Sequence, residues 1–237
     1  MKVTIVVPTI RTNNCSFFIK GLKSNKIEYE VLFLGPNKPD FDLPKNFHFI
    51  QTNVKPPQCL EAGTRLAKGE LIMYSGDDFS FIEDNPLDKL YDEYVTIGRS
   101  DVLLSTTFAI NGVSQLRQPF VWFDQYATAS VGLMSREFHI KMGGLDKNFI
   151  AVLADADLHL RIWESGGKVV ISDIVCSENF SLGSRLFNTY GNEDHTTLVN
   201  LWKYCPFSLK RTKLLSPFAD DNILNITQGP KGEWHET

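Results

Sequence analysis

The sequence of 237 residues lacks several features that mark other protein classes. Its four cysteines are widely spaced, with neither a C-x-x-C pair nor a metal-ligand pattern. Cys59 and Cys176 stand beside apolar residues and are interpreted as buried thiols of a reducing compartment. No run approaches the roughly 18 apolar residues of a membrane span, and the apolar part of MKVTIVVPTI is too short for a signal peptide. These absences predict a soluble, cytoplasmic protein.

An excess of positive charge is missing as well. The formal net charge is −4, so no global basic field attracts nucleic acid. A local basic patch stays open, and a nucleic-acid acceptor is therefore only less expected. The sequence contains no internal repeat, no low-complexity segment and no phosphate-binding G-x-x-x-x-G-K-[ST] loop. What it does contain is 43% hydrophobic residues, enough for one large α/β domain or one domain with a C-terminal extension.

The first part of the chain alternates between strand and helix patterns. Apolar runs rich in β-branched residues predict strands at 2–10, 29–37, 46–53 and 70–76. Helices are predicted over 13–25 and over 56–69, where two prolines open the segment and a glycine ends it. Strands that alternate with helices in this way form an open parallel sheet with right-handed crossovers.

Residues 85–179 continue the pattern. Helices are predicted over 85–98 and 154–167, and strands over 101–110 and 168–179. Residues 128–144 are predicted to form a strand and then a helix that begins near Ser135. Asn111 and Gly112 favour a hairpin turn. From about 180 the pattern weakens, which predicts a C-terminal extension (181–237) with a mobile loop, a helix around 195–204 and a frayed end.

Two adjacent carboxylates, Asp77 and Asp78, follow the predicted strand over 70–76. With Gly76 they make reasonable turn chemistry, and a plain acidic turn is one interpretation. A divalent cation is the other, because it needs carboxylate oxygens and cancels the repulsion between two like charges. Ligands of open parallel sheets bind outside the carboxyl ends of the strands, where these two residues stand. On this stretch alone both interpretations stay open.

Three stretches together resemble the inverting GT-A glycosyltransferases of the family-2 type. VTIVVPTI is similar to that family's opening strand with its trailing proline, and EAGTRLAKGELIMYSGDD is similar to its run N-x-G-x-x-x-A-x-G-E-Y-I-x-F-L-D-x-D-D. VGLMSREFHIKMGGLDKNFIAVLADADLHLRIWESGGKVV is similar to the acceptor-side pattern, in which a G-G-[FL]-D turn leads to E-D-x-D-L-x-x-R. The resemblance covers roughly residues 2–175. It implies an α/β GT-A fold with an open, mainly parallel central sheet flanked by helices.

The resemblance also implies an activity. A catalytic domain is expected over 1–180, with a nucleotide-binding half (1–80) and an acceptor half (100–180). It would transfer a hexosyl or pentosyl group, with inversion, from a nucleotide diphosphate-sugar to a glycan or other hydroxyl acceptor. A UDP-sugar is favoured because it is common in the family.

This chemistry assigns two carboxylates. The leaving diphosphate builds up negative charge, for which Mn²⁺ or Mg²⁺ held by Asp78 is expected. The attacking hydroxyl needs a general base, and Asp155 aligns with the base of the family. The position of Asp155 near a helix N-terminus favours its ionised form. Asp155 could instead merely cap that helix.

Further residues are expected around the donor. Those assigned to donor binding are Pro8, Thr9, Arg11, Gly35, Asp77, Gly144 and Arg185. Arg185 would clamp the diphosphate from a loop that orders on donor binding. His195 would complete the metal shell, as C-terminal histidines do in several GT-A enzymes. An exposed loop arginine and a structural histidine are the plainer interpretations, and they stay open.

The chain departs from the family pattern at several positions. Gly76 stands where the family has the first metal-motif aspartate, Glu61 where it has an asparagine, and Ala154 where it has the acceptor-side glutamate. The acidic turn that commonly holds the nucleotide base is LGPN here. Asp157 is interpreted as the i,i+4 surface partner of Arg161, and acceptor binding is the second interpretation.

Two other functions remain as alternatives. A non-catalytic nucleotide-sugar or glycan-binding module is favoured by the losses at Gly76 and Ala154. A nucleotidyltransferase is the second alternative, because AGTRLA is similar to the G-x-G-T-R-x loop of that family. That loop directly follows the first strand in nucleotidyltransferases, whereas here it stands past residue 60 inside a helix pattern.

Overall fold

The computed structural model describes residues 2–110, 116–117, 120–122, 126–128, 131–179, 186–203 and 209–219. Its strands are β1 (Val3–Pro8), β2 (Tyr29–Gly35), β3 (Phe47–Gln51), β4 (Leu71–Tyr74), β5 (Phe79–Phe81), β6 (Val102–Ile110), β7 (Leu116–Arg117), β8 (Phe120–Trp122), β9 (Tyr126–Thr128), β10 (Gly132–Ser135) and β11 (Lys168–Glu178). Its helices are α1 (Thr12–Gly21), α2 (Pro56–Leu66), α3 (Pro86–Ile97), α4 (Arg136–Lys141), α5 (Ala154–Glu164) and α6 (Leu186–Leu201). The predicted α/β class is confirmed.

One mixed sheet organises the molecule, with the strand order β3-β2-β1-β4-β10-β6-β11-β5 and with β7 paired to β6. β1 runs parallel to β2 and β4, and β2 runs parallel to β3. Because both faces of these strands are covered, β1 is apolar at nearly every position and its residues 3–7 are fully buried. The strands and helices predicted for the first 76 residues are confirmed within a few residues. The short strand β5, directly after Asp78, was not predicted.

The second half of the sheet contains an antiparallel insertion. β10 runs antiparallel to both β4 and β6, and β6 runs parallel to β11. β1, β2, β4, β6 and β11 therefore all point the same way. Their carboxyl ends meet along one edge of the sheet, which is where open α/β sheets bind ligands.

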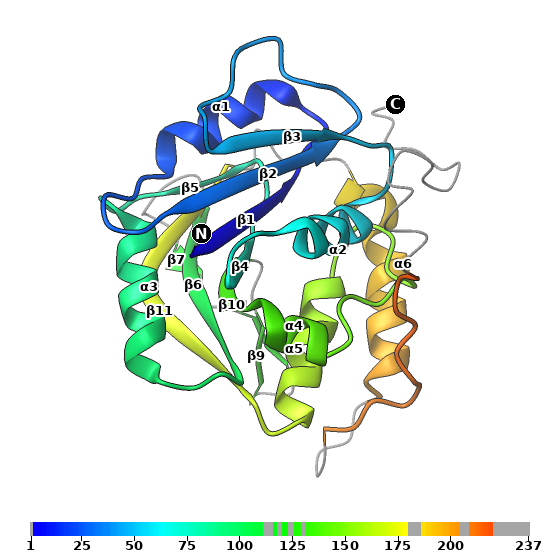
Figure 1. The fold of residues 1–237 in the computed structure, drawn as a ribbon. Coiled ribbons are helices and arrows are strands. Elements are labelled where there is room, and N and C mark those ends of the chain that lie inside the picture. Colours follow the sequence, from blue (N-terminus) through cyan, green and yellow to red (C-terminus); the bar gives the residue numbers. More distant parts are fainter. Residues whose placement is uncertain are drawn as a thin grey trace.

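Helices cover both faces of the curled sheet (Figure 1). On one face α1 and α3 bury an apolar cluster that includes Phe18, Leu87 and Leu90. On the other face α2, α4, α5 and α6 bury a second cluster that includes Leu158 and Trp202. Cys15, Cys59 and Cys176 are buried and free, which confirms the interpretation of the second and third as buried thiols. None of the described helices is long and apolar enough to cross a membrane.

The last described helix corrects the sequence analysis. α6 begins at Leu186, so residues 186–192, which were expected in a mobile loop, are helical. Asn and Gly made this stretch read as a loop, because they are weak helix formers. Packing outweighs that preference here, since Gly191, Asp194 and Leu198 are buried against the rest of the molecule. The turn at 111–112, Arg185, Cys205 and the end of the chain lie outside the described residues.

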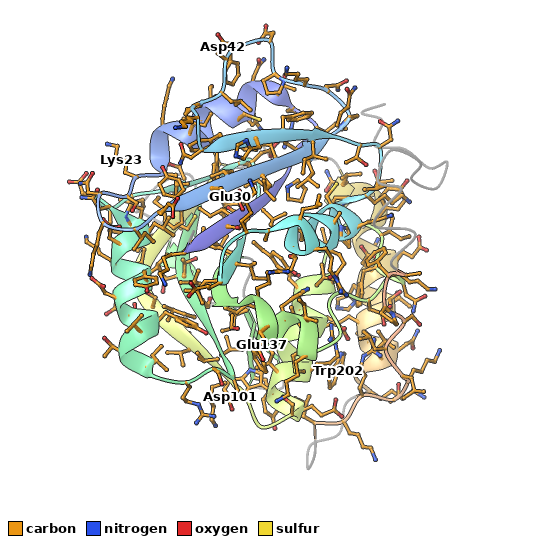
Figure 2. All side chains as sticks on the ribbon, viewed as in Figure 1. Lys23, Glu30, Asp42, Asp101, Glu137 and Trp202 are labelled. Carbon is orange, nitrogen blue, oxygen red and sulfur yellow. The ribbon has the colours of Figure 1, made fainter. Side chains whose placement is uncertain are left out.

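The ion pair between Asp157 and Arg161 is confirmed, but its surface location is wrong. The two atoms Asp157 Oδ2 and Arg161 Nε are 2.9 Å apart, and both side chains are buried. Trp202 lies beside α5 (Figure 2) and donates from Nε1 to Asp157 Oδ1 at 2.8 Å, and Arg211 Nε donates to the same oxygen at 3.0 Å. The residues after α6 therefore cover a helix face that looked solvent-exposed in the sequence.

Candidate functional site

The carboxyl ends of β1 and β4 bring three of the predicted site residues together. The Thr9 hydroxyl donates to Asp77 Oδ2 at 2.6 Å, and the Arg11 guanidinium lies 3.5 Å from Asp77 Oδ1. These residues are far apart in sequence, but the parallel register of β1 and β4 places Val6 beside Tyr74 and so aligns the loops that follow. Burial raises the pKa of Asp77, while Thr9 and Arg11 oppose that rise. The Asp77 carboxylate thus has partners within the protein, and it ties the loop after β1 to the loop after β4.

Gly35 and Pro8 stand next to this cluster. Pro8 pairs with Leu34 in the sheet, and the Thr9 amide donates to the Leu34 carbonyl at 2.8 Å. A Cβ on Gly35 would lie 1.6 Å from the Thr9 carbonyl oxygen. Only glycine therefore allows the end of β2 to approach Thr9 this closely.

Asp78 occupies a different environment from its neighbour. Burial, followed by the charges of Asp77 and Glu178, raises the pKa of Asp78 to about 7. Glu178 is brought close because β5 pairs with β11, which sets Phe79 opposite Glu178, and because the Asn179 amide donates to the Asp78 carbonyl at 2.9 Å. The negative charges of Asp77 and Glu178 thus act on Asp78 in a partly buried setting, which makes a nearby cation favourable.

The glycine of the Gly-Asp-Asp sequence has a steric explanation. A Cβ on Gly76 would lie 2.5 Å from Asp78 Oδ1 and 2.9 Å from the Phe79 ring. An aspartate at position 76 would therefore displace the side chain of Asp78 from its present position. The glycine that departs from the family motif therefore leaves the space that the Asp78 carboxylate occupies.

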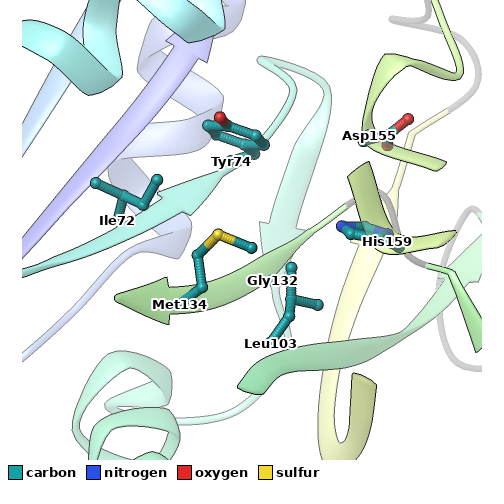
Figure 3. A pocket seen from close by; sticks show the side chains of 7 residues that line it. All are labelled: Ile72, Tyr74, Leu103, Gly132, Met134, Asp155 and His159. Carbon is teal, nitrogen blue, oxygen red and sulfur yellow. The ribbon is translucent and has the colours of Figure 1, made fainter. Parts of the chain in front are cut away.

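Asp155 faces a small cavity beside the end of β4 (Figure 3). The cavity has a volume of about 10 Å³, which is room for about one water molecule. Its lining combines Asp155 and His159 of α5 with apolar or aromatic groups of the sheet, namely Ile72, Tyr74, Leu103, Gly132 and Met134. Asp155 and His159 share it because residues four apart lie on the same helix face.

The electrostatics of Asp155 differ from the expectation. Its place in the first turn of α5 was expected to favour the ionised form, but burial raises its pKa to about 6. The hydrogen bond from the Ala156 amide to Asp155 Oδ1, at 2.8 Å, opposes this shift only in part. Loss of hydration thus outweighs the helix terminus. Burial also lowers the pKa of His159 to about 3, so the imidazole beside Asp155 is neutral at physiological pH.

The alternative of a helix cap is not what the geometry of α5 provides. The N-cap position is Leu153, whose side chain makes no capping hydrogen bond, and Asp155 is the second residue of the helix. The Asp155 carboxylate is bonded to the adjacent amide of Ala156. It is therefore placed at the start of α5 without occupying the N-cap.

Gly144 lies against Glu61. A Cβ on Gly144 would lie 2.5 Å from Glu61 Oε2, and the Leu145 amide donates to that oxygen at 3.1 Å. His139 Nε2 is 2.9 Å from the same oxygen, and the Tyr74 hydroxyl is 3.0 Å from His139 Nδ1. Burial alone would raise the pKa of Glu61, but the hydrogen bonds of its partners lower it. Glu61, which replaces the asparagine of the family, thus ties α2 to α4.

The predicted metal ligands are not gathered into a cluster. Within the described ranges, no group of three or more His, Cys, Asp or Glu side chains is arranged to hold a metal ion. His195 is exposed on α6, next to the buried Asp194. Asp78 offers carboxylate oxygens close to the negative charges of Asp77 and Glu178. This suits a cation such as Mg²⁺, which binds one or two protein carboxylates and completes its shell with substrate phosphates and water.

Sequence reasoning missed Glu178 and His159. Glu178 ends a strand that was predicted, but nothing in the sequence indicates that β11 pairs with β5 and ends beside Asp78. His159 could have been found, since it stands four residues after the predicted base on one helix.

No protein-family model and no curated protein matches this sequence. Solved structures do. Residues 1–349 of S. aureus TarS match with a TM-score of 0.60 and 14% identity over 76% of this chain and 60% of that one. GalNAc-T7, solved with UDP, GalNAc and Mn²⁺, matches with a TM-score of 0.65 and 10% identity over 85% and 48% of the two chains. The mannosyltransferase PcManGT from Pyrobaculum calidifontis, in complex with GDP-Man and Mn²⁺, matches with a TM-score of 0.55 and 14% identity over 75% and 56%.

These identities are low, so the likeness concerns the fold. The chain also spans only 48–60% of the length of these three solved chains. The sheet order, the helices on both faces and these neighbours agree with one another: the chain has the GT-A fold found in glycosyltransferases.

Proposed function

We propose that this chain is a metal-dependent glycosyltransferase that moves a sugar from a nucleotide diphosphate-sugar to an acceptor hydroxyl with inversion. The observation that carries the proposal is the placement of Asp78 and Asp155 around the carboxyl end of β4. Tyr74, the last residue of β4, lines the cavity that Asp155 borders, and Asp78 follows four residues later. An in-line displacement needs charge neutralisation at the leaving group and a base at the attacking group, and this arrangement offers one carboxylate for each.

Asp155 is proposed as the general base. A base works best when its pKa is near the operating pH, and the pKa of about 6 leaves Asp155 ionised at neutral pH while keeping its affinity for a proton. The apolar lining of the adjacent cavity keeps bulk water from stabilising the carboxylate. The acceptor is proposed to be a glycan or another hydroxyl compound.

Asp78 is proposed to hold Mn²⁺ or Mg²⁺ with the donor diphosphate, and His195 is kept as a proposed second ligand. A bound divalent cation would supply neutralisation of the charge that develops on the leaving diphosphate. The chain's own contribution is the partly buried Asp78 carboxylate, held against Gly76 where no side chain competes for the space.

The loops after β1 and β2 are proposed to hold the nucleotide. Thr9 and Arg11 are fixed by Asp77, so their backbone and the guanidinium are positioned before the donor arrives. Pro8 and Gly35 shape the same edge. Gly144, Asp77 and Arg185 complete the proposed donor site, Gly144 through the turn that precedes α5.

A panel of donors tests the binding part. UDP- and GDP-sugars are added to the protein with Mn²⁺ and the melting temperature is measured, because a ligand that binds only the folded state raises it. A UDP-sugar is expected to give the largest rise, and Asp78→Ala should abolish that rise. Asp84→Asn, which removes a charge from an exposed position nearby, is the matched control. If EDTA and Asp78→Ala both leave donor binding unchanged, the metal assignment is wrong.

A single substitution tests the base. Asp155→Asn preserves shape and should retain donor affinity, while release of nucleotide in Mn²⁺ should fall at least about 10²-fold. A purely structural role at the start of α5 predicts little change, because an Asn side-chain oxygen can also accept a hydrogen bond from the Ala156 amide. Turnover above about a tenth of the wild-type value in this variant would remove Asp155 from the mechanism. Donor binding without any nucleotide release by the wild type would instead favour the non-catalytic binding module.

A further inference from the structure

Asp194, on α6, binds three successive backbone amides of a loop distant in sequence. Its side chain is fully buried. Oδ1 accepts from the Ile150 amide, and Oδ2 accepts from the amides of Ala151 and Val152, each at 2.8 Å. Hydrogen bonds to a carboxylate are short and strong, so these three contacts fix the course of residues 150–152.

The loop that Asp194 holds leads directly into α5. Its next residue, Leu153, has φ 64° and ψ 0°, a left-handed conformation that is costly for a residue with a branched side chain. The helix begins at Ala154, and Leu153 provides no side-chain cap. Such strained conformations persist only when the surroundings enforce them. Asp194 contributes to this from outside the loop, because it fixes the three residues before Leu153, whose side chain packs against the core.

We propose that Asp194 is a positioning residue for Asp155 and acts through the backbone of residues 150–153. This inference rests on the proposed function, in which Asp155 is the base. Asp155 stands two residues after Leu153, so a change of Leu153 to an ordinary backbone conformation redirects the first turn of α5. The Asp155 carboxylate would then leave the cavity beside Tyr74.

Docking of α6 does not by itself explain this carboxylate. The apolar side chains of Leu198, Leu201 and Trp202 already bury α6 in the core cluster that includes Leu158. A buried carboxylate is costly unless it is fully hydrogen-bonded, and an apolar residue would dock the helix without that cost. The hydrogen bonds to Asp194 fix the orientation of the three amides, which an apolar contact would not do.

The test compares Asp194→Asn with Glu193→Gln, which removes a charge from the adjacent, exposed position of α6. Hydrolysis of UDP-N-acetylglucosamine in Mn²⁺ is the activity probe, or of GDP-mannose if the donor panel selects it. In Asp194→Asn we expect turnover to fall about 10- to 100-fold through misplacement of the base, with donor affinity within about twofold of the wild type. Amide exchange at residues 150–152 should accelerate at least about tenfold. Glu193→Gln should match the wild type in all three measurements.

A second substitution separates positioning from general destabilisation. Glycine adopts the left-handed conformation without strain, so Leu153→Gly in the Asp194→Asn background should restore a large part of the turnover. Leu153→Ala removes nearly the same side chain but keeps the strain, and it should not restore turnover. If Asp194→Asn does not fold alone, the Leu153→Gly double variant is assayed. A double variant that also fails to fold shows that Asp194 serves the fold, and the inference is withdrawn.

The outcomes distinguish this inference from the proposed function. If Asp155→Asn is inactive while Asp194→Asn is fully active, the positioning role is overturned and the base assignment stands. Asp155→Asn fully active would end both, because there would be no base to position. Loss of turnover in both variants, with rescue by Leu153→Gly alone, supports both.

Discussion

At the scale of single residues, the two adjacent aspartates of the Gly-Asp-Asp turn have separate roles. Asp77 is held by Thr9 and Arg11, whereas burial, followed by the charges of Asp77 and Glu178, raises the pKa of Asp78. Burial raises the pKa of both carboxylates, and at Asp78 the neighbouring negative charges add to that effect. A residue kept in an unfavourable ionisation state costs stability, and such residues concentrate at functional sites.

That cost is measurable at Asp78. Its pKa is about 7 in the folded state and about 4 in the unfolded chain, so the folded state binds more protons between these values and stability falls as pH rises through them. In EDTA at about pH 8, Asp78→Asn should therefore be more stable than the wild type by on the order of 1 kcal/mol, discounted for partial exposure, or a few degrees in Tm. The gain should vanish near pH 4. Thermal unfolding at both pH values checks this, with Asp84→Asn as the control.

The pKa of Asp155 sets a pH dependence of turnover. Protonated Asp155 cannot accept a proton, so the rate of nucleotide release at saturating donor and Mn²⁺ should fall about tenfold per unit as pH drops below about 6. Saturating Mn²⁺ is needed because protons also compete for Asp78 near pH 7. A rate that stays flat down to about pH 5 would contradict the assignment of Asp155 as the base.

At the scale of elements, α5 is fixed from two sides. Its first turn is preceded by the loop that Asp194 holds. Asp157, the fourth residue of α5, accepts hydrogen bonds from Trp202 and Arg211, which lie after the helix in the chain. Arg211 links this helix to the turn after α4, because it bonds both Asp157 and Asp146. The residues after α6 thereby secure the helix that carries Asp155.

Removing the Arg211 side chain should strongly lower the free energy of unfolding. Arg211→Ala leaves the buried carboxylates of Asp146 and Asp157 without one of their charged partners, and loss of one member of a buried ion pair costs about 3–5 kcal/mol. Lys213→Ala, at an exposed position two residues along, should cost less than about 0.5 kcal/mol. The free energies of unfolding from urea titrations give the comparison. Equal effects of the two variants would show that the Arg211 network contributes little.

At the scale of the whole molecule, the sequence pattern predicts a division between a catalytic domain (1–180) and a C-terminal extension, and this division raises the question whether the first part is stable alone. The division itself stays a prediction. The packing of Leu198, Leu201 and Trp202 into the core cluster of α2, α4 and α5 shows that the extension shares the core of the residues before it.

We therefore expect a chain that ends at residue 180 not to fold on its own. It would expose the apolar surface that α6 covers and would leave Asp157 without its hydrogen bonds from Trp202 and Arg211. Circular dichroism and a urea titration of the truncated chain measure this. A cooperative unfolding transition close to that of the full chain would show that residues 1–180 are an independent domain.

The sequence by itself determined the order and type of most elements. Strands such as β1 and β2 are continuous apolar runs because both of their faces are buried, and that pattern is local. It also placed Asp77 and Asp78 at a strand end, and the resemblance to glycosyltransferases singled out Asp155. The sequence was misleading over residues 186–192, where weak helix formers are held in α6 by packing.

The tertiary structure alone decided which groups meet. The pairing of β5 with β11 brings Glu178 to Asp78, the reach of Arg211 buries Asp157, and α6 brings Asp194 to the loop before α5. Burial also decided the pKa of Asp155, against the expectation from its helix terminus. These contacts join residues far apart in the chain, and the free energy of burying a charge depends on everything that surrounds it. Local pattern carries no information on either.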